Sequence, residues 1–212
     1  MTPDAADHAV TLDGLGAGPA SSPSDVLGDA AVVRAVIDGD REAFRVLVDR
    51  ELGNVVRTAE RVLGDRHEAE DVAQEAFVTA YRALATWRAE GPFGAWIARI
   101  AVRIAIRRAA RRRVLPWTQP GRLADEDDRT LALPARTGDP EGTAVRGERA
   151  RDVRQAVAAL DEPYREVVAL RFFADRSLDE IATITGRPLG TIKTHLRRGL
   201  IRLRDGLREL GE

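Results

Sequence analysis

The chain has 212 residues, of which 44% are hydrophobic and 32% charged, and its formal net charge is −1. This composition suffices for a buried core, but no run approaches the roughly 20 apolar residues that a membrane-spanning helix needs. The absence of cysteine excludes disulfides, thiolate catalysis and cysteine zinc sites, and the three histidines are too scattered to indicate a metal centre.

From these observations we expect neither a metal nor a cofactor. The beginning of the chain lacks a basic segment followed by an apolar one, so we expect no signal peptide and a cytoplasmic protein. Residues 1–30 contain five Asp and no Arg or Lys, together with several Gly, Pro and Ser. A segment of this kind cannot form a core, which predicts a disordered acidic tail.

Three helices are predicted next. A short one spans residues 29–37, and Asp40 is placed to cap a longer one that reaches Leu63 and could be broken near Gly53. The third begins at Asp65, where a capping-box pattern opens a run with apolar residues at three- and four-residue steps. Its outward face is acidic with an embedded amide, and carries Asp71, Gln74, Glu75, Val78 and Arg82. Most acidic helical faces are simply solvated. The acidic face indicates a binding surface only in contrast to the charge of the helix that follows it.

A strongly basic helix begins after Gly91 and Pro92. The side chains spaced to be buried in it are Phe93, Trp96, Ile97, Ile100 and Ile104. Arginines follow one another four residues apart at Arg99, Arg103, Arg107 and Arg111, and more follow at Arg108, Arg112 and Arg113. All but one of the 33 basic residues are Arg, so their distribution is the informative quantity: residues 31–75 carry a net charge of −4, and residues 76–113 carry +8. Such a rigid stripe can follow a phosphate backbone.

Helical periodicity stops between residues 114 and 149, where prolines, glycines and an acidic run at 125–128 interrupt it. We interpret this stretch as a flexible linker. Helical patterns resume at residue 150, and no segment shows the alternation of a strand. The sequence therefore predicts an all-α protein with two small helical domains, residues 31–113 and 150–212.

The end of the second domain has the pattern of a helix-turn-helix. Ser177 opens a capping box, Gly186 marks a turn, and Pro188 suits the first position of the final helix. The outer face of that helix is polar and basic near its start, at Thr191, Lys193, Thr194, Arg197 and Arg198. Such a helix fits the major groove, where Arg and Lys reach guanine and a Thr methyl packs on thymine. Basic helical hairpins also occur in proteins that do not bind DNA, but the capping box, turn and basic face together favour DNA binding.

Three motifs, in order, resemble the signatures of the extracytoplasmic-function (ECF) sigma factors of bacterial RNA polymerase. They lie at residues 70–77 (EDVAQEAF), 93–101 (FGAWIARIA) and 190–196 (GTIKTHL). The resemblance covers about 31–113 and 150–210. It implies a non-enzymatic initiation subunit, with a first domain similar to sigma region 2 and a second similar to region 4.

The resemblance implies a role for each surface. The acidic helix would dock on the clamp helices of the largest polymerase subunit through Glu70, Asp71, Gln74, Glu75 and Phe77. The basic helix and the loop before it would open the minus-10 promoter element and hold its unpaired strand through Trp87, Phe93, Trp96, Arg99, Arg103, Arg107 and Arg111. The final helix would read the minus-35 element as duplex through Thr191, Lys193, Thr194, Arg197 and Arg198.

The chain also departs from the family pattern. Arg103 and Arg107 stand where the family often has Asn and Asp, so the resemblance does not imply a minus-10 base preference. We expect no sensing domain fused after Glu212. The resemblance therefore implies control by a separate anti-sigma factor that clamps both domains.

Two other functions are open at this level. The main alternative is an operator-binding helix-turn-helix regulator, because residues 191–195 also resemble response-regulator DNA-binding domains; such proteins usually bind duplex as symmetric dimers. An enzyme acting on nucleic acid would need converging carboxylates on a metal, or a nucleophile with a base. The acids here are predicted on outward helical faces without a partnering histidine, which disfavours an enzyme.

Overall fold

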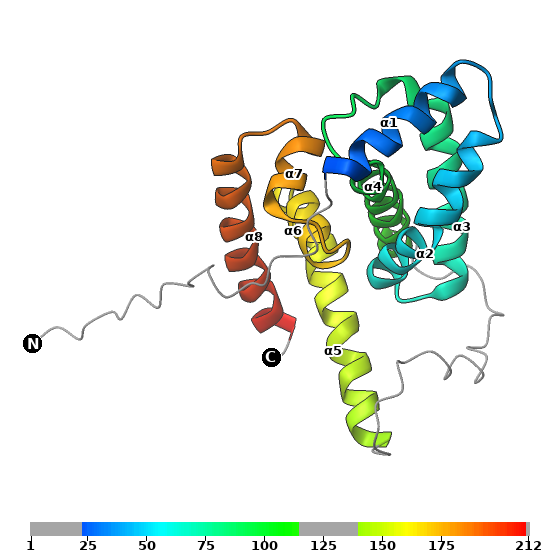
Figure 1. Cartoon of the computed structure of the whole chain (residues 1–212). Coiled ribbons are helices and arrows are strands. Elements are labelled where there is room, and N and C mark those ends of the chain that lie inside the picture. The colour runs from blue at the N-terminus through cyan, green and yellow to red at the C-terminus, as the bar shows by residue number, and fades with distance from the viewer. Residues whose placement is uncertain (1–22, 115–139, 211–212) are drawn as a thin grey trace, which may run out of the picture.

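The computed structural model describes residues 23–114 and 140–210. Its elements are α1 Pro23–Ile37, α2 Ala43–Leu63, α3 Arg66–Arg82, the 3-10 turn η2 Leu84–Thr86, α4 Phe93–Val114, α5 Pro140–Ala159, α6 Tyr164–Phe172, α7 Leu178–Thr185 and α8 Leu189–Leu210. Two groups of helices, α1–α4 and α5–α8, lie side by side (Figure 1). No strand occurs in the described residues, and the predicted all-α fold is confirmed.

Two helices begin earlier than the sequence pattern indicates. Helix α1 starts at Pro23, inside the predicted tail, and α5 starts at Pro140, inside the predicted linker. Proline suits the first turn of a helix, because its missing N–H has no partner there and its φ is already helical. The rest of both predicted segments, residues 1–22 and 115–139, lies outside the described residues.

Helix α2 runs unbroken through Gly53, so the suggested break is wrong. The side chains of Leu47 and Val55 are buried on the inner face of the helix. This packing outweighs the cost of a helical glycine, which is about 1 kcal/mol relative to alanine. The N-cap position of α2 is Glu42 rather than the predicted Asp40, and the side chain of Glu42 makes no capping hydrogen bond. Asp40, two residues earlier, still accepts hydrogen bonds from the backbone N–H groups of Glu42 at 3.1 Å and Ala43 at 3.2 Å.

The other predicted turns and caps are present. Gly64 ends α2 with a φ of 72°, a left-handed conformation that glycine adopts readily. Asp65 accepts a hydrogen bond from a backbone N–H in the first turn of α3 at 2.9 Å. Ser177 and Glu180 form a reciprocal capping box, and Gly186 ends α7 with a φ of 67°. Local sequence therefore determines where α2, α3 and α7 begin or end.

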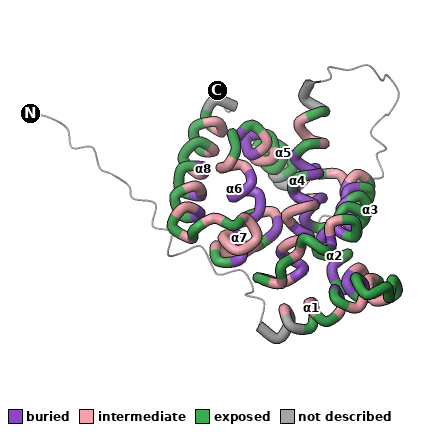
Figure 2. The backbone as a smooth tube through the Cα atoms, turned by 90° about the horizontal axis from the view of Figure 1, so that it is seen from above, coloured by how far each residue is buried: buried purple, intermediate pink, exposed green. Residues whose placement is uncertain are grey.

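Helix α4 lies at the centre of the molecule. It packs against α2 and α3 on one side and against α6 and α7 on the other. Figure 2 shows buried backbone along it, between the two groups. Its buried side chains go round most of the helix and are Phe93, Ala95, Ile97, Ala98, Ala101, Val102, Ile104, Ala105 and Ile106. None of the helices seen between 23 and 114 or between 140 and 210 is both long and apolar enough to cross a membrane.

The beginning of α4 is held by side chains of α1 and α2. Asp29, which is 1% exposed, accepts a hydrogen bond from the backbone N–H of Phe93 at 2.7 Å and also pairs with Arg50. The first N–H groups of a helix have no partner within the helix, so this carboxylate caps α4 from another element. The backbone of α4 approaches α2 closely at Gly94, because a Cβ at this position would lie 2.6 Å from Oε2 of Glu51.

Asp29→Ala is expected to destabilise the first helix group by about 2 kcal/mol. The change leaves the buried N–H of Phe93 without an acceptor, which costs about 1–3 kcal/mol. Arg50 adds less to the loss, since its side chain is 43% exposed and can return to water. Chemical denaturation followed by circular dichroism measures the effect, with the exposed Asp38→Ala as control. An unchanged denaturation midpoint for Asp29→Ala would contradict the assigned cap.

In the second group, α6 and α8 meet at Gly199. A Cβ at this position would lie 2.7 Å from Cγ2 of Val168 and 3.4 Å from Cβ of Tyr164, so only glycine permits the approach. The inner face of α8 is anchored there by Ile192 and Leu196, which are 0% and 1% exposed. The opposite face of α8 is thereby held toward solvent.

Candidate nucleic-acid interface

The acidic face of α3 is exposed. Arg108 of α4 reaches this face, with its nitrogens 3.6 Å from Asp71 and 3.4 Å from Glu75. The two carboxylate side chains remain 69% and 51% exposed, so each pair contributes at most about 1 kcal/mol and the face stays acidic. Val78, half exposed, adds apolar area to it. The predicted docking residues exposed here are Glu70, Asp71, Gln74 and Glu75.

Two aromatic residues predicted to contact partners are core residues instead. Phe77 is 7% exposed and Phe93 is 0% exposed. Both rings pack edge-on against Phe44, with the ring centroids 6.4 Å apart in each pair. Polymerase and DNA reach these rings only if the first helix group unpacks, so the structure gives Phe77 and Phe93 a packing role in place of the predicted exposed contact position.

The row of four arginines on α4 divides into two halves. Arg107 and Arg111 are exposed and form no ion pair with any residue that the structure describes. Arg99 and Arg103 lie earlier on the same face, where both contact Glu166 of α6. Only half of the predicted stripe is therefore free in this arrangement.

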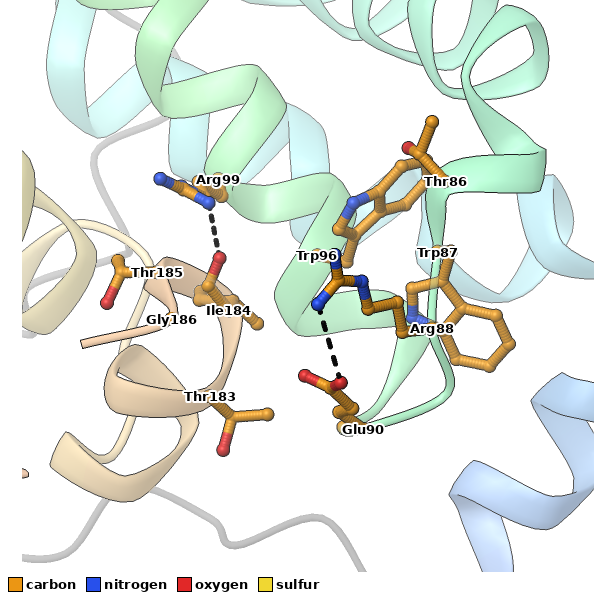
Figure 3. Close-up of a pocket in the computed structure, with 11 residues that line it drawn as sticks. Thr86, Trp87, Arg88, Glu90, Trp96, Arg99, Thr183, Ile184, Thr185 and Gly186 are labelled. Atoms are coloured by element: carbon orange, nitrogen blue, oxygen red, sulfur yellow. Dashed lines mark hydrogen bonds and ion pairs between the residues drawn. The ribbon is translucent and has the colours of Figure 1, made fainter. Parts of the chain in front are cut away.

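A group of charges forms around one buried carboxylate, that of Glu166, and is here called the Glu166 cluster. Its cations are Arg99 and Arg187, which are partly exposed, and Arg103, whose side chain is 57% exposed. Oε1 of Glu166 accepts hydrogen bonds from Nε of Arg99 and Nε of Arg103, each at 2.9 Å. Oε2 accepts from Arg187 at 3.2 Å, and the residue is 3% exposed. Arg99 also donates to the backbone carbonyl of Ile184, at the end of α7 (Figure 3). One carboxylate thus joins α4 to α6 and to the turn before α8.

The Glu166 cluster is expected to weaken in acid. Burial raises the pKa of Glu166, but the hydrogen bond from Arg99 and the charges of Arg99, Arg103 and Arg187 outweigh burial and hold this pKa below its ordinary value of 4.5. Because the pKa is lowered, the stabilisation is fully present above 4.5 and is lost as the pH falls through the lowered value. Small-angle scattering should show the radius of gyration rising in that range. Glu166→Gln cannot titrate, so an identical acid transition in this variant would contradict the assignment.

A cavity of about 370 Å³ lies where the loop before α4 faces the end of α7. Trp87 and Trp96, both predicted to contact minus-10 DNA, are partly buried and line it on the side of the first group. Thr183 and Gly186 line it on the side of the second group, and Figure 3 shows them across from the two indole rings. The second group thus stands in front of the predicted strand-opening loop.

The start of α8 is an exposed basic surface. Lys193, Arg197 and Arg198 are exposed, and none of them forms an ion pair within residues 23–114 and 140–210. Thr194 is also exposed, and its hydroxyl donates to the carbonyl four residues earlier at 2.9 Å, so this hydroxyl is engaged within the helix. Thr191 is half-buried. The predicted duplex-reading residues therefore share one face, and its cations have no competing partner there.

His195, on the same helix, has a packing role. Its ring lies edge-on to Tyr164 with the centroids 5.7 Å apart. Burial, with the charges of Arg187 and Arg198, lowers the pKa of His195 from its ordinary value. The lowered pKa favours the neutral ring, which helps to fix α8 on α6.

Sequence reasoning missed the acid that faces the basic helix. A signal was present, since Glu166 shares its helical face with Ala169 and Leu170, both buried. Buried carboxylates are generally paired, so a cationic partner could be expected but not identified. Arg61 of α2 and Asp175, in the turn after α6, form a further ion pair between the groups, away from the Glu166 cluster. No local pattern predicts that pair.

These surfaces are suited to binding by charge. No group of His, Asp and Glu side chains in the described part of the chain is placed to hold a metal. A helix that begins with exposed cations fits the major groove of a duplex. A surface that combines arginines with aromatic rings fits an unpaired strand, because bases stack on rings and phosphates pair with arginine.

Known families match both helix groups, in the same order. The family model for Sigma-70 region 2 matches residues 47–114, and the model for Sigma-70 region 4 matches residues 150–203. The chain is 33% identical over 180 residues to the ECF RNA polymerase sigma factor SigW of Bacillus subtilis, which covers 84% of this chain and 96% of that protein. It is 31% identical over 176 residues to the ECF RNA polymerase sigma-E factor of Escherichia coli K12, which covers 82% of this chain and 92% of that protein.

A solved structure shares the fold. It is that of CnrH in complex with the cytosolic domain of CnrY, with a TM-score of 0.52 and 21% sequence identity. The match covers 88% of this chain and 98% of that one. Because the identity is low, this likeness concerns the arrangement of the helices alone.

Proposed function

The chain belongs to the ECF sigma factors of RNA polymerase, and we propose that it gives core polymerase its promoter choice through three separate surfaces. The acidic face of α3 docks on the clamp helices of the largest polymerase subunit. The basic face of α4 holds the separated strand of the minus-10 element. The basic start of α8 reads the minus-35 element as duplex.

One observation carries this proposal. Within the described residues the cations at the start of α8 are exposed and unpaired, and they lie on a helix-turn-helix that follows a second, separate basic helix. Two positive surfaces of this kind suit paired and unpaired DNA in one promoter. The acidic face of α3 is opposite in sign and repels DNA, which supports its assignment to a protein partner.

The chain is also proposed to act in the cytoplasm, where polymerase works, and to catalyse no covalent reaction. The melting of DNA costs about a few kcal/mol for each unstacked base. Binding of the exposed strand to Arg107, Arg111 and the indoles of the first group offsets that cost. Control by a separate anti-sigma factor follows from the family, and a bound inhibitor would have to cover at least one of the three surfaces.

In vitro transcription tests the proposed function. Purified core polymerase is supplied with a library of promoter fragments, with and without the chain, and the transcripts are sequenced. The expected result is a defined set of start sites that depends on the chain and shares two spaced elements. Identical transcripts with and without the chain would reject the proposal. Tight binding to a palindromic duplex without polymerase would favour an operator-binding regulator instead.

A further inference from the structure

The Glu166 cluster shows what the basic face of α4 binds when no DNA is present. A single carboxylate oxygen accepts hydrogen bonds from two arginines one turn apart, Arg99 and Arg103, each at 2.9 Å. A phosphate oxygen offers the same arginine nitrogens an anionic acceptor of similar size. The second helix group therefore supplies an internal substitute for a DNA phosphate.

Other contacts hold the two groups in the same arrangement. Arg61 of α2 donates to Asp175 and, at 3.2 Å, to the backbone carbonyl of Phe173. Near the strand-opening loop, a Cβ added at Gly91 would lie 3.2 Å from Cγ2 of Thr183. The end of α7 thus lies directly against the loop, while the Glu166 cluster lies beside it on α4.

We propose that this arrangement is a closed state, in which Glu166 occupies the phosphate position of α4 and the end of α7 covers the strand-opening loop. Single-stranded DNA and Glu166 then compete for Arg99 and Arg103. The free chain binds the unpaired strand weakly, and full binding requires the second group to move away. The inference rests on the proposed function of α4, the binding of the unpaired strand, and adds how the second helix group regulates that binding.

The two ends of the second group differ in this state. The Glu166 cluster and the cavity cover the side of α4 that holds Arg99 and Trp96. The start of α8 is not covered, since Lys193, Arg197 and Arg198 are exposed. Duplex can therefore be recognised in the closed state, whereas the unpaired strand can be held only after opening.

Glu166→Gln tests the closed state, because it removes the charge and keeps the shape of the side chain. The matched control is Glu162→Gln, whose carboxylate lies just before α6, pairs with Arg165 three residues later at 3.1 Å, and is 56% exposed. The chain has no cysteine, so Asp49→Cys and Arg208→Cys give a specific pair of label sites, one on each group. The first readout is the distance distribution between these labels in the full chain.

The second readout is the affinity for a mixed-sequence single-stranded oligonucleotide, without polymerase. It is measured in a background in which Lys193, Arg197 and Arg198 are alanine, so that binding reports α4. Glu166→Gln is expected to lengthen and broaden the label distances and to raise the affinity about tenfold, as when a state populated at roughly one part in ten becomes the main one. Glu162→Gln should change neither quantity.

Each other outcome overturns a part of the inference. Unchanged distances would reject the closed state, and opening without a gain in affinity would reject masking of α4. If Glu166→Gln fails to fold, Asp175→Asn is used instead, because Asn tolerates the φ of 53° at that position and removes the pair with Arg61. If Glu166→Gln opens and gains affinity as expected but the wild-type chain supports no promoter-specific transcription, the proposed function alone is rejected.

Discussion

Core polymerase is expected to bind the chain at least about a hundredfold more weakly when Asp71, Gln74 and Glu75 are all changed to Arg. These side chains form the exposed acidic face of α3, and their reversal would place like charges against a partner surface selected for acids. Juxtaposed like charges cost several kcal/mol, and about 3 kcal/mol corresponds to roughly a hundredfold in Kd. Fluorescence anisotropy of the labelled chain with core polymerase measures the loss directly.

Two controls separate docking from folding. Arg108→Ala removes the partner of Asp71 and Glu75 without touching the acidic face, so polymerase binding should be unchanged or stronger. Asp49→Arg reverses an exposed acid on α2 and should have little effect. If the triple variant of α3 keeps wild-type affinity while it folds normally, the acidic face does not dock on polymerase and the assignment of α3 fails.

Changing Lys193, Arg197 and Arg198 to alanine is expected to abolish specific binding of minus-35 duplex. The three cations are exposed and unpaired among the described residues, so they are available to phosphates and base edges without breaking an internal contact. A good bidentate base contact contributes about 1–3 kcal/mol of discrimination. If all three cations contact phosphates, the negative slope of log affinity against log salt should become shallower by about 0.9 for each cation, roughly 2.7 in total.

The matched control for the α8 variant lies at the other end of the same helix. Arg204→Ala with Arg208→Ala removes two exposed cations from α8 and leaves its first turns intact. Its duplex affinity and salt slope should stay close to wild type. Equal losses from both ends would mean that duplex binds α8 through its overall charge, and the recognition role of the first turns would be excluded.

Local chemistry explains why several elements could be predicted from sequence. The caps at Asp65 and Ser177 and the left-handed glycines at Gly64 and Gly186 involve residues a few positions apart, and all are present. Helix α1 was predicted too short because its first turns have no apolar periodicity and begin at Pro23 within an acidic stretch. Periodicity and capping patterns do not locate the start of α1, because contacts with residues distant in sequence decide whether such a segment is helical.

The site shows the same limit more clearly. Periodicity places Arg99 and Arg107 on one face of α4, but it contains no information on what lies opposite that face. The structure pairs Arg99 with Glu166, far away in sequence, and leaves Arg107 free of ion pairs among the described residues. Phe93 shows the converse, since its spacing predicts a buried ring and a family motif suggested a contact surface. Its burial shows that the spacing was the better guide.

Lys193 is the only lysine of the chain, and its ammonium group is exposed at the start of α8. An amine-selective reagent therefore modifies one side chain, besides the terminal amine, and this side chain lies on the proposed groove-facing surface. Mass spectrometry can follow the extent of labelling as promoter duplex is added. Protection of this single amine would give an occupancy curve for the recognition helix within the intact holoenzyme, without any mutation.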